Sequence, residues 1–133
     1  MSVIGDAIQE KCLAFGERVI RLNDYLLEQA AQTSNDKVPS YLKSIAVLSN
    51  QLLRAGTSIG ANNAEAISAI SKADFKSKSY IALKEARESL YWIELLFRNN
   101  YIDNKQYQSI YNDCEEIVKL LTHRCKKLNE QKE

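Results

Sequence analysis

Apolar side chains recur near the start of the chain at alternating steps of four and three residues. This spacing is typical of a helix that packs nearly parallel to its neighbours, and it predicts a helix near 6–32. Turn-forming residues interrupt the pattern at 33–40, where Pro39 fits the first turn of a new helix, because that N–H has no intrahelical partner in any case. The apolar positions of this first series are Ile8, Cys12, Phe15, Val19, Leu22 and Leu26.

A second apolar series keeps its phase through a segment rich in poor helix formers. Gly56, Thr57, Ser58 and Gly60 lie in this segment, and a glycine costs about 1 kcal/mol in a helix relative to alanine. Because the phase is kept, we predict one unbroken helix near 40–69. Its two glycines are expected to let the second and third helices approach closely. The apolar series is Tyr41, Ile45, Leu48, Leu52, Ala55, Ile59, Asn62 and Ala66.

Two patterns of the capping-box type predict where two further helices begin. Ser71 is expected to cap the third helix with Asp74 reaching back, and Asp103 with Gln106 forms the same pattern before the fourth helix. The predicted helices cover about 73–99, ended by Asn99 and Asn100, and about 103–130. The apolar series of the fourth is Tyr107, Tyr111, Cys114, Val118, Leu121, Cys125 and Leu128.

Four long helices with short connections define the expected fold. No segment alternates apolar and polar residues with a period of two, so no sheet is predicted. The chain has 133 residues, 4 Gly and 1 Pro, which fits one domain with few interruptions. We therefore predict an all-α single domain over 1–133, an up-down-up-down antiparallel four-helix bundle.

The third helix is apolar over a wider arc than one core-facing stripe requires. Tyr91, Trp92 and Leu95 are the candidate anchors of an oligomer or partner interface, because Trp and Tyr are common hot spots of protein contacts. The alternative is that this helix is simply the most buried of the four.

Polar residues flank the apolar positions of the second and third helices. If these helices pack together, Arg54 can meet Glu85 or Glu88, with Asn62 and Glu65 nearby. The favoured interpretation is a half-buried ion-pair network that fixes helix register. The alternatives are a ligand or partner pocket lined by the same five residues, and a solvated surface.

Basic residues gather in two places although the formal net charge is only +1. Each cluster alone is more typical of a solvated face, but an oligomer repeats it and adds phosphate contacts. We therefore regard RNA or DNA, held mainly through its backbone, as a candidate partner. The candidate residues are Lys72, Lys76, Lys78, Lys84 and Arg87 on the third helix, and Lys119, Arg124, Lys126 and Lys127 on the fourth.

No catalytic or metal-binding pattern is evident in the sequence. The one histidine, His123, has no glutamate three residues before it and no arginine five residues before it. Such partners are what a di-metal bundle or a four-helix ribonuclease of similar architecture would carry. We predict no enzymatic activity, no cofactor and no metal.

The three cysteines and the apolar segments indicate the cellular setting. All three cysteines fall in apolar series and are expected to be buried structural thiols. No signal-peptide pattern opens the chain and no apolar run is long enough to span a membrane. A cytoplasmic protein without a membrane partner is expected.

Residues 51–96 resemble a known family. The segments QLLRAGTSIGANNAEA and SKADFKSKSYIALKEARESLYWIELL are similar to the four-helix-bundle proteins encoded by intervening sequences inside bacterial 23S rRNA genes. Asn63 departs from the pattern, which more often has a larger or aromatic residue there. The matching positions are Arg54, Ser58, Asn62, Glu65, Ser71, Asp74, Phe75, Lys84, Glu85, Glu88 and Trp92.

The resemblance implies a four-helix bundle that assembles into a homo-oligomeric ring, with a pentamer the first expectation. A similar bundle serves as the accessory protein of diversity-generating retroelements, beside a reverse transcriptase and nucleic acid. The resemblance implies no settled biochemical activity. The sequence therefore predicts either a ring that binds nucleic acid or a protein-interaction scaffold without direct nucleic-acid contact.

Overall fold

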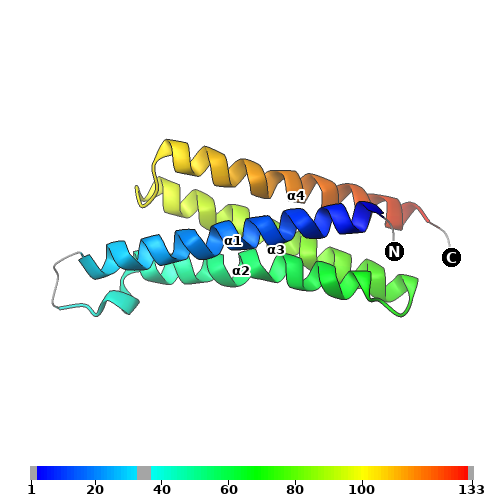
Figure 1. The fold of residues 1–133 in the computed structure, drawn as a ribbon, viewed down its shortest axis with the longest axis horizontal. Coiled ribbons are helices and arrows are strands. Elements are labelled where there is room, and N and C mark those ends of the chain that lie inside the picture. The colour runs from blue at the N-terminus through cyan, green and yellow to red at the C-terminus, as the bar shows by residue number, and fades with distance from the viewer. Residues whose placement is uncertain (1–2, 33–36, 132–133) are drawn as a thin grey trace.

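Four long helices lie side by side in the computed structural model (Figure 1). It describes residues 3–32 and 37–131, with side chains from residue 7 onward. The helices alternate in direction, so both chain termini lie at one end of the molecule, and the described residues include no strand. This is the predicted antiparallel four-helix bundle. The elements are α1 (Val3–Gln32), the 3-10 helix η1 (Ser40–Leu42), α2 (Ser44–Ile67), α3 (Lys72–Arg98) and α4 (Asn104–Glu130).

The start of the second helix differs from the prediction. Pro39 precedes only the short η1, and Lys43 has an extended backbone (ψ 147°) that separates η1 from α2. The Lys43 ammonium donates to the carbonyl of Ala30 at 2.9 Å, which ties this corner to the end of α1. Tyr41, predicted to be part of the apolar series, is 68% exposed because it lies before the helix begins.

The predicted caps form at both ends of the α3–α4 connection. Asp103 and Gln106 make a complete capping box at the start of α4. α3 ends as its two asparagines predict: Asn100 adopts a left-handed conformation (φ 63°) and its N–H bonds to the carbonyl of Phe97. The N–H of Tyr101 reaches the carbonyl of Leu96 at 2.9 Å. This pair of bonds is the Schellman motif, with asparagine in the position that glycine more often holds.

At the start of α3, the predicted capping box forms only in part. Ser71 accepts a hydrogen bond from the Asp74 N–H at 3.0 Å and is the N-cap, as predicted. The Asp74 carboxylate, however, accepts from the N–H of Ile70 at 3.4 Å rather than from that of Ser71.

The core is built from the predicted apolar series. The residues of these series that are buried share the interior of the bundle, and α1 and α4 follow their predicted phase. In α2 the prediction is wrong by one residue at three positions: Ala46, Ser49 and Asn63 are buried, whereas Ile45, Leu48 and Asn62 are half-buried. The residues that α3 buries in the core are mainly small, with a few large ones. Most of its other large apolar side chains are only partly buried, so much of its apolar arc remains open. The buried series positions are Ile8, Cys12, Phe15, Val19, Leu26, Leu52, Ala55, Ile59, Ala66, Cys114, Leu121 and Cys125.

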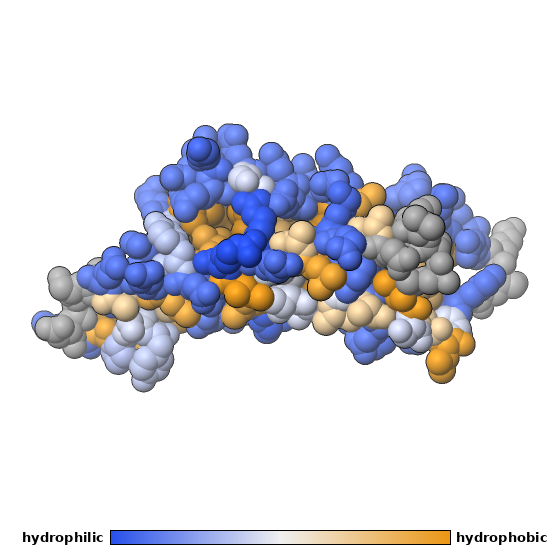
Figure 2. All heavy atoms as spheres, viewed as in Figure 1, coloured by the Kyte–Doolittle hydropathy of each residue, from blue (hydrophilic) through white to orange (hydrophobic). Residues whose placement is uncertain are grey.

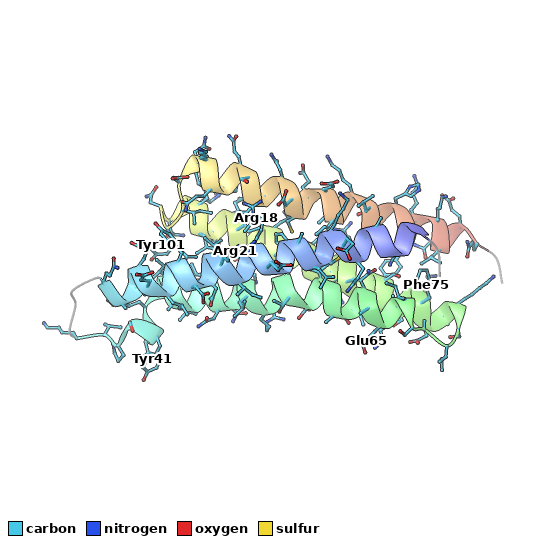
Figure 3. The ribbon with its side chains drawn as sticks, viewed as in Figure 1. Arg18, Arg21, Tyr41, Glu65, Phe75 and Tyr101 are labelled. Carbon is cyan, nitrogen blue, oxygen red and sulfur yellow. The ribbon has the colours of Figure 1, made fainter. Side chains whose placement is uncertain are left out.

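The four helix pairs do not pack equally. α2 packs extensively against both α1 and α3, whereas α1 makes only limited backbone approach to α4. Polar side chains close this last pair: Arg18 lies 2.5 Å from Asp113 and donates to the Ser109 hydroxyl at 3.0 Å. Lys11 lies 2.7 Å from Glu116. Figure 3 shows Arg18 on the side of α1 that faces α4.

Gly56 and Gly60 allow a close approach between helices, as predicted. The helix that approaches them is α1, however, and not α3, which the prediction named. A Cβ on Gly56 would lie 3.0 Å from Val19 Cγ2, and one on Gly60 would lie 3.2 Å from Cys12 Cβ. The helix itself is unbroken through both, as predicted. The small residues of α2 occupy adjacent faces of the helix, so their spacing alone does not show which neighbour they approach.

We expect Gly56→Ala to destabilise the fold by about 1 kcal/mol, because overpacking of a core outweighs the gain in helix propensity. Val19 is β-branched and its rotamer in a helix is stiff, so it cannot turn away. In a Val19→Ala background the obstructing methyl groups are absent, and the same substitution should become stabilising. A double-mutant cycle by urea unfolding measures this coupling; equal effects in both backgrounds would contradict the close approach.

Candidate functional site

The predicted ion pair between α2 and α3 is present. Arg54 bonds through Nη2 to the Glu88 carboxylate, and its Nη1 lies 3.6 Å from Glu85 Oε2. That second distance is too long for a hydrogen bond, and the buried Oε2 of Glu85 has no hydrogen-bond partner. The Arg54 side chain is 52% exposed. The Glu88 and Glu85 side chains are only 37% and 20% exposed. The pair is therefore half-buried on its carboxylate side, as predicted, and exposed on its guanidinium side.

The predicted interface residues of α3 adjoin this ion pair. The Trp92 indole donates to Glu88 Oε2 at 3.0 Å, so Glu88 joins Arg54 to Trp92. The Tyr91 ring lies edge-on to Trp92, with 4.9 Å between centroids, and is 57% exposed. Trp92 and Leu95 are half-buried. The predicted anchors thus form a partly open aromatic surface on α3.

Asn62 and Glu65 do not join one network with Arg54. The Asn62 amide donates to the Ser58 carbonyl of its own helix at 2.8 Å. Glu65 pairs instead with Lys78 of α3, at 3.5 Å. None of the five predicted network residues lines either cavity described here, one at each end of the bundle.

Asn63, the neighbour of Asn62, holds a buried polar position near the end of α2. Its side chain is fully buried. It donates to Gln9 of α1 at 2.7 Å and accepts from Arg124 of α4 at 2.7 Å. Arg124 also reaches the Ser79 hydroxyl of α3 at 3.4 Å. These four residues, which we call the Asn63 network, connect all four helices. The departure of Asn63 from the family pattern was the one sign of it in the sequence.

Arg124 differs from its predicted role in a basic cluster. Its guanidinium is held by Asn63 and Ser79 and lies over the Phe75 ring, 5.2 Å from the centroid. Burial lowers the pKa of Arg124 from its usual value. Lys78 and Lys119 are also engaged, with Glu65 and with Glu115 at 3.6 Å.

The bundle end that carries both chain termini contains a cavity, here called the end pocket. Its volume is about 570 Å³, and Phe75, which helps to line it, lies at this end in Figure 3. Lys72 from the start of α3 and Lys127 from the end of α4 line it together with Arg124 and the exposed His123, and none of the lining residues that the structure describes is acidic. The apolar lining includes Ile8, Ala66, Ile67, Ile70, Leu120 and Leu128.

The opposite end of the bundle also carries a cavity, of about 630 Å³. Tyr25 of α1, Leu42 of η1 and Tyr101 of the α3–α4 connection help to line it. None of the residues predicted to bind nucleic acid contributes to it. This second cavity has one basic lining residue, Lys43, whose ammonium donates to the Ala30 carbonyl, whereas Lys72, Arg124 and Lys127 all line the end pocket.

All three cysteines are buried and free, as predicted. Burial raises the pKa of Cys12 to about 11, an effect that the nearby Arg124 partly opposes. Burial likewise raises the pKa values of Cys114 and Cys125. The Cys114 thiol donates to the Ala86 carbonyl at 3.3 Å and so joins α4 to α3. Since the thiolate is the reactive form, these groups are inert at neutral pH.

Comparison with known proteins identifies the family. The family of 23S rRNA-intervening sequence proteins matches residues 18–123, most of the chain. The chain belongs to this family. A protein with unknown function from the S23 ribosomal protein family of Bacteroides thetaiotaomicron VPI-5482 is 43% identical in sequence to this chain. Its crystal structure matches the fold with a TM-score of 0.80. The alignment covers 93% of this chain and 99% of that one. A comparison with curated proteins gives no significant match.

The predicted family membership is thus confirmed, and with it the bundle fold. In the described part of this 23S rRNA-intervening sequence protein, no helix is long and apolar enough to cross a membrane. The same residues contain no group of three or more His, Cys, Asp or Glu side chains placed to hold a metal ion.

We expect Asn63→Ala to cost about 2–4 kcal/mol of unfolding free energy, because it removes both hydrogen bonds of a fully buried side chain and leaves the partly buried Gln9 oxygen and Arg124 guanidinium without that partner. Asn62→Ala is the matched control and should cost less than about 1 kcal/mol, since Asn62 bonds only to its own helix. Arg54→Ala should also cost less than about 1 kcal/mol, as for an ion pair whose guanidinium is exposed. Urea unfolding of the three variants checks this, and similar costs for Asn62 and Asn63 would contradict it.

Because Cys12 is buried, the stability of the fold is expected to fall with rising pH in the alkaline range. The native thiol keeps its proton while the unfolded thiol loses it above its ordinary pKa of 9.0. This contribution is therefore complete below pH 9.0 and is lost as the pH rises from there toward 11, at up to about 1.4 kcal/mol per pH unit. We expect Cys12→Ala to reduce the slope of unfolding free energy between these values. An unchanged slope would contradict the assignment.

Proposed function

We propose that the protein is the subunit of a homo-oligomeric ring, with five subunits the first expectation, that binds the phosphate backbone of RNA or DNA. The end pocket is its contact surface for nucleic acid. The observation that carries this proposal is the convergence of Lys72 and Lys127, far apart in the sequence, on one pocket whose described lining residues include no acidic side chain. A cationic surface of this kind attracts phosphate, and a ring repeats it on every subunit.

The chemistry of the end pocket supports contact with the backbone rather than with base sequence. Lysine ammonium groups act as point charges on phosphates, and the pocket interior is mostly apolar, with Phe75 exposing part of an aromatic ring. Arg124 adds positive charge while it stays bound to Asn63. Such a surface favours recognition by charge and shape.

The proposal includes no catalytic step. The cysteine thiols are buried and protonated at neutral pH. His123 is exposed at the end pocket, and no hydrogen bond to a serine, threonine or carboxylate is observed for it within the described residues. No nucleophile therefore stands beside a base.

A second candidate function is that of a protein-interaction scaffold or accessory subunit without nucleic-acid contact. The observation that favours it is the open aromatic surface of α3, since an exposed Tyr beside a half-buried Trp is typical of a binding hot spot.

Binding to a structured RNA and to duplex DNA, measured over a range of salt concentrations, tests the proposal. We expect affinity to fall steeply with salt, and Lys72→Gln and Lys127→Gln each to reduce the slope of log K against log salt by about 1 for each subunit in contact. Lys105→Gln is the matched control, because Lys105 is exposed near the start of α4, outside the end pocket. Light scattering gives the oligomer mass in parallel.

Two outcomes would contradict the proposal. A wild-type protein with the mass of one subunit would remove the ring and the additive contacts built on it. An intact ring that binds neither nucleic acid at low salt would favour the scaffold.

A further inference from the structure

A closed ring of more than two subunits requires two different contact surfaces on each subunit. Only a dimer with two-fold symmetry can use the same patch on both partners, whereas a ring joins one patch to a second, complementary patch on the next subunit. The surface around Tyr91 supplies one such patch. The complementary patch lies on α1, and its assignment as a subunit contact rests on the proposed ring.

The first patch, here called the Tyr91 patch, runs along the outer side of α3. Lys84, Tyr91 and Arg98 are spaced seven residues apart, so they lie along one line of the helix. All three are exposed, and Arg87 lies beside this line. Arg98 pairs with Glu94 at 2.8 Å, whereas no ion pair is observed for Lys84 or Arg87 within the described residues. Glu88 and Glu94 also adjoin Tyr91 on the helix, but they pair with Arg54 and Arg98. The patch is therefore a projecting aromatic ring with the positive charges of Lys84 and Arg87 beside it.

The second patch lies on α1. Leu13 and Ile20 are 52% and 47% exposed and are seven residues apart, on one face of the helix. Apolar side chains interrupt the hydrophilic surface along the middle of the face shown in Figure 2, over α1 and α2. Beside Leu13 and Ile20 runs a parallel line of exposed acidic residues at the same spacing: Glu10, Glu17 and Asp24. Glu17 lies 3.8 Å from Arg21 of the same helix, so Glu10 and Asp24 supply most of the negative charge.

Gly16 makes a notch between Leu13 and Ile20. A Cβ built on Gly16 would meet no atom within 4 Å, although the backbone there is shielded by its neighbours. Gly56 and Gly60 are explained by their contact with α1, but nothing within the subunit requires a glycine at position 16. A poor helix former in the middle of a 30-residue helix is understandable if a side chain of another molecule enters the open space.

We infer that the Leu13–Gly16–Ile20 notch of one subunit receives the Tyr91 patch of a second copy of this chain. The two surfaces are complementary in shape, since one projects and the other is open. They are also complementary in charge, since lysine and arginine flank Tyr91 and acidic residues flank the notch. Because the patches lie on α1 and α3, which do not pack directly against each other, the contact passes from subunit to subunit and can close a ring.

This arrangement divides the predicted basic residues between two roles. Lys84 and Arg87 lie in the subunit contact, while Lys72 and Lys127 stay at the end pocket, outside that contact. Assembly and nucleic-acid binding can therefore be altered by separate substitutions.

Two variants that each remove one patch test the inference when they are mixed. Tyr91→Gln removes the projecting ring, and Gly16→Gln fills the notch without a clash inside the subunit. We expect light scattering to give each variant alone the 15.1 kDa mass of one subunit. An equimolar mixture should form a species of twice that mass, because the intact notch of one variant still receives the intact Tyr91 of the other.

Ala14→Gln is the matched control, since it places the same side chain on another exposed position of α1 and should leave the wild-type mass unchanged. Circular dichroism of each variant checks that the bundle is folded; Gly16→Gln should melt no lower than the isolated Tyr91→Gln subunit, because glutamine is the better helix former.

The outcomes separate this inference from the proposed ring. A wild-type oligomer that survives Gly16→Gln but is lost with Tyr91→Gln would overturn the notch and leave the ring intact. Two monomeric variants that do not associate on mixing would indicate a symmetric contact, which also overturns it. A monomeric wild-type protein would remove the proposed ring itself, and this inference with it.

Discussion

The buried carboxamide of Asn63 is the point at which the four helices are joined. It bonds to Gln9 on α1 and to Arg124 on α4, and Arg124 continues to Ser79 on α3. An apolar bundle core tolerates sliding of one helix along another, whereas a buried polar group is satisfied in only one register. The close approach of α1 and α2 at Gly56 and Gly60 has the same effect, because a shift of either helix would bring larger side chains together. The position of the end pocket follows, since Arg124 is fixed in its lining.

The sequence predicted the helices and most of the core because a bundle repeats one simple pattern. Steps of three and four residues located Ile8, Phe15, Leu52 and Leu121, all buried. The α2 start was misplaced because Pro39 is compatible with a 3-10 turn as well as with an α-helix. In helices, boundaries depend on local backbone geometry, such as the extended conformation of Lys43, which the apolar pattern does not encode.

The candidate site was predicted less completely, for a physical reason. Asn62 and Asn63 are adjacent, and one residue corresponds to a rotation of about 100° on a helix. Choosing which of the two points inward requires knowledge of its partners on α1 and α4, far away in the sequence. The ion pair between Arg54 and Glu88 could be predicted because both residues flank the apolar series of neighbouring helices. Arg124 shows the limit of counting charges, since its guanidinium is bound to Asn63 and Ser79 within the subunit even though it also lines the end pocket.

Because the contact between α1 and α4 is partly polar, local stability is expected to differ between the helix pairs of the bundle. α2 packs closely against α1 and α3, whereas α1 and α4 make only a limited backbone approach, with Arg18, Lys11 and their carboxylate partners at the rim of the shared core. Local unfolding begins where few apolar contacts must be broken. Amide hydrogens along α4 and the outer turns of α1 should therefore exchange with solvent sooner than those of the α2–α3 hairpin. This hairpin is formed from residues close in sequence, so it is also the natural place for folding to start.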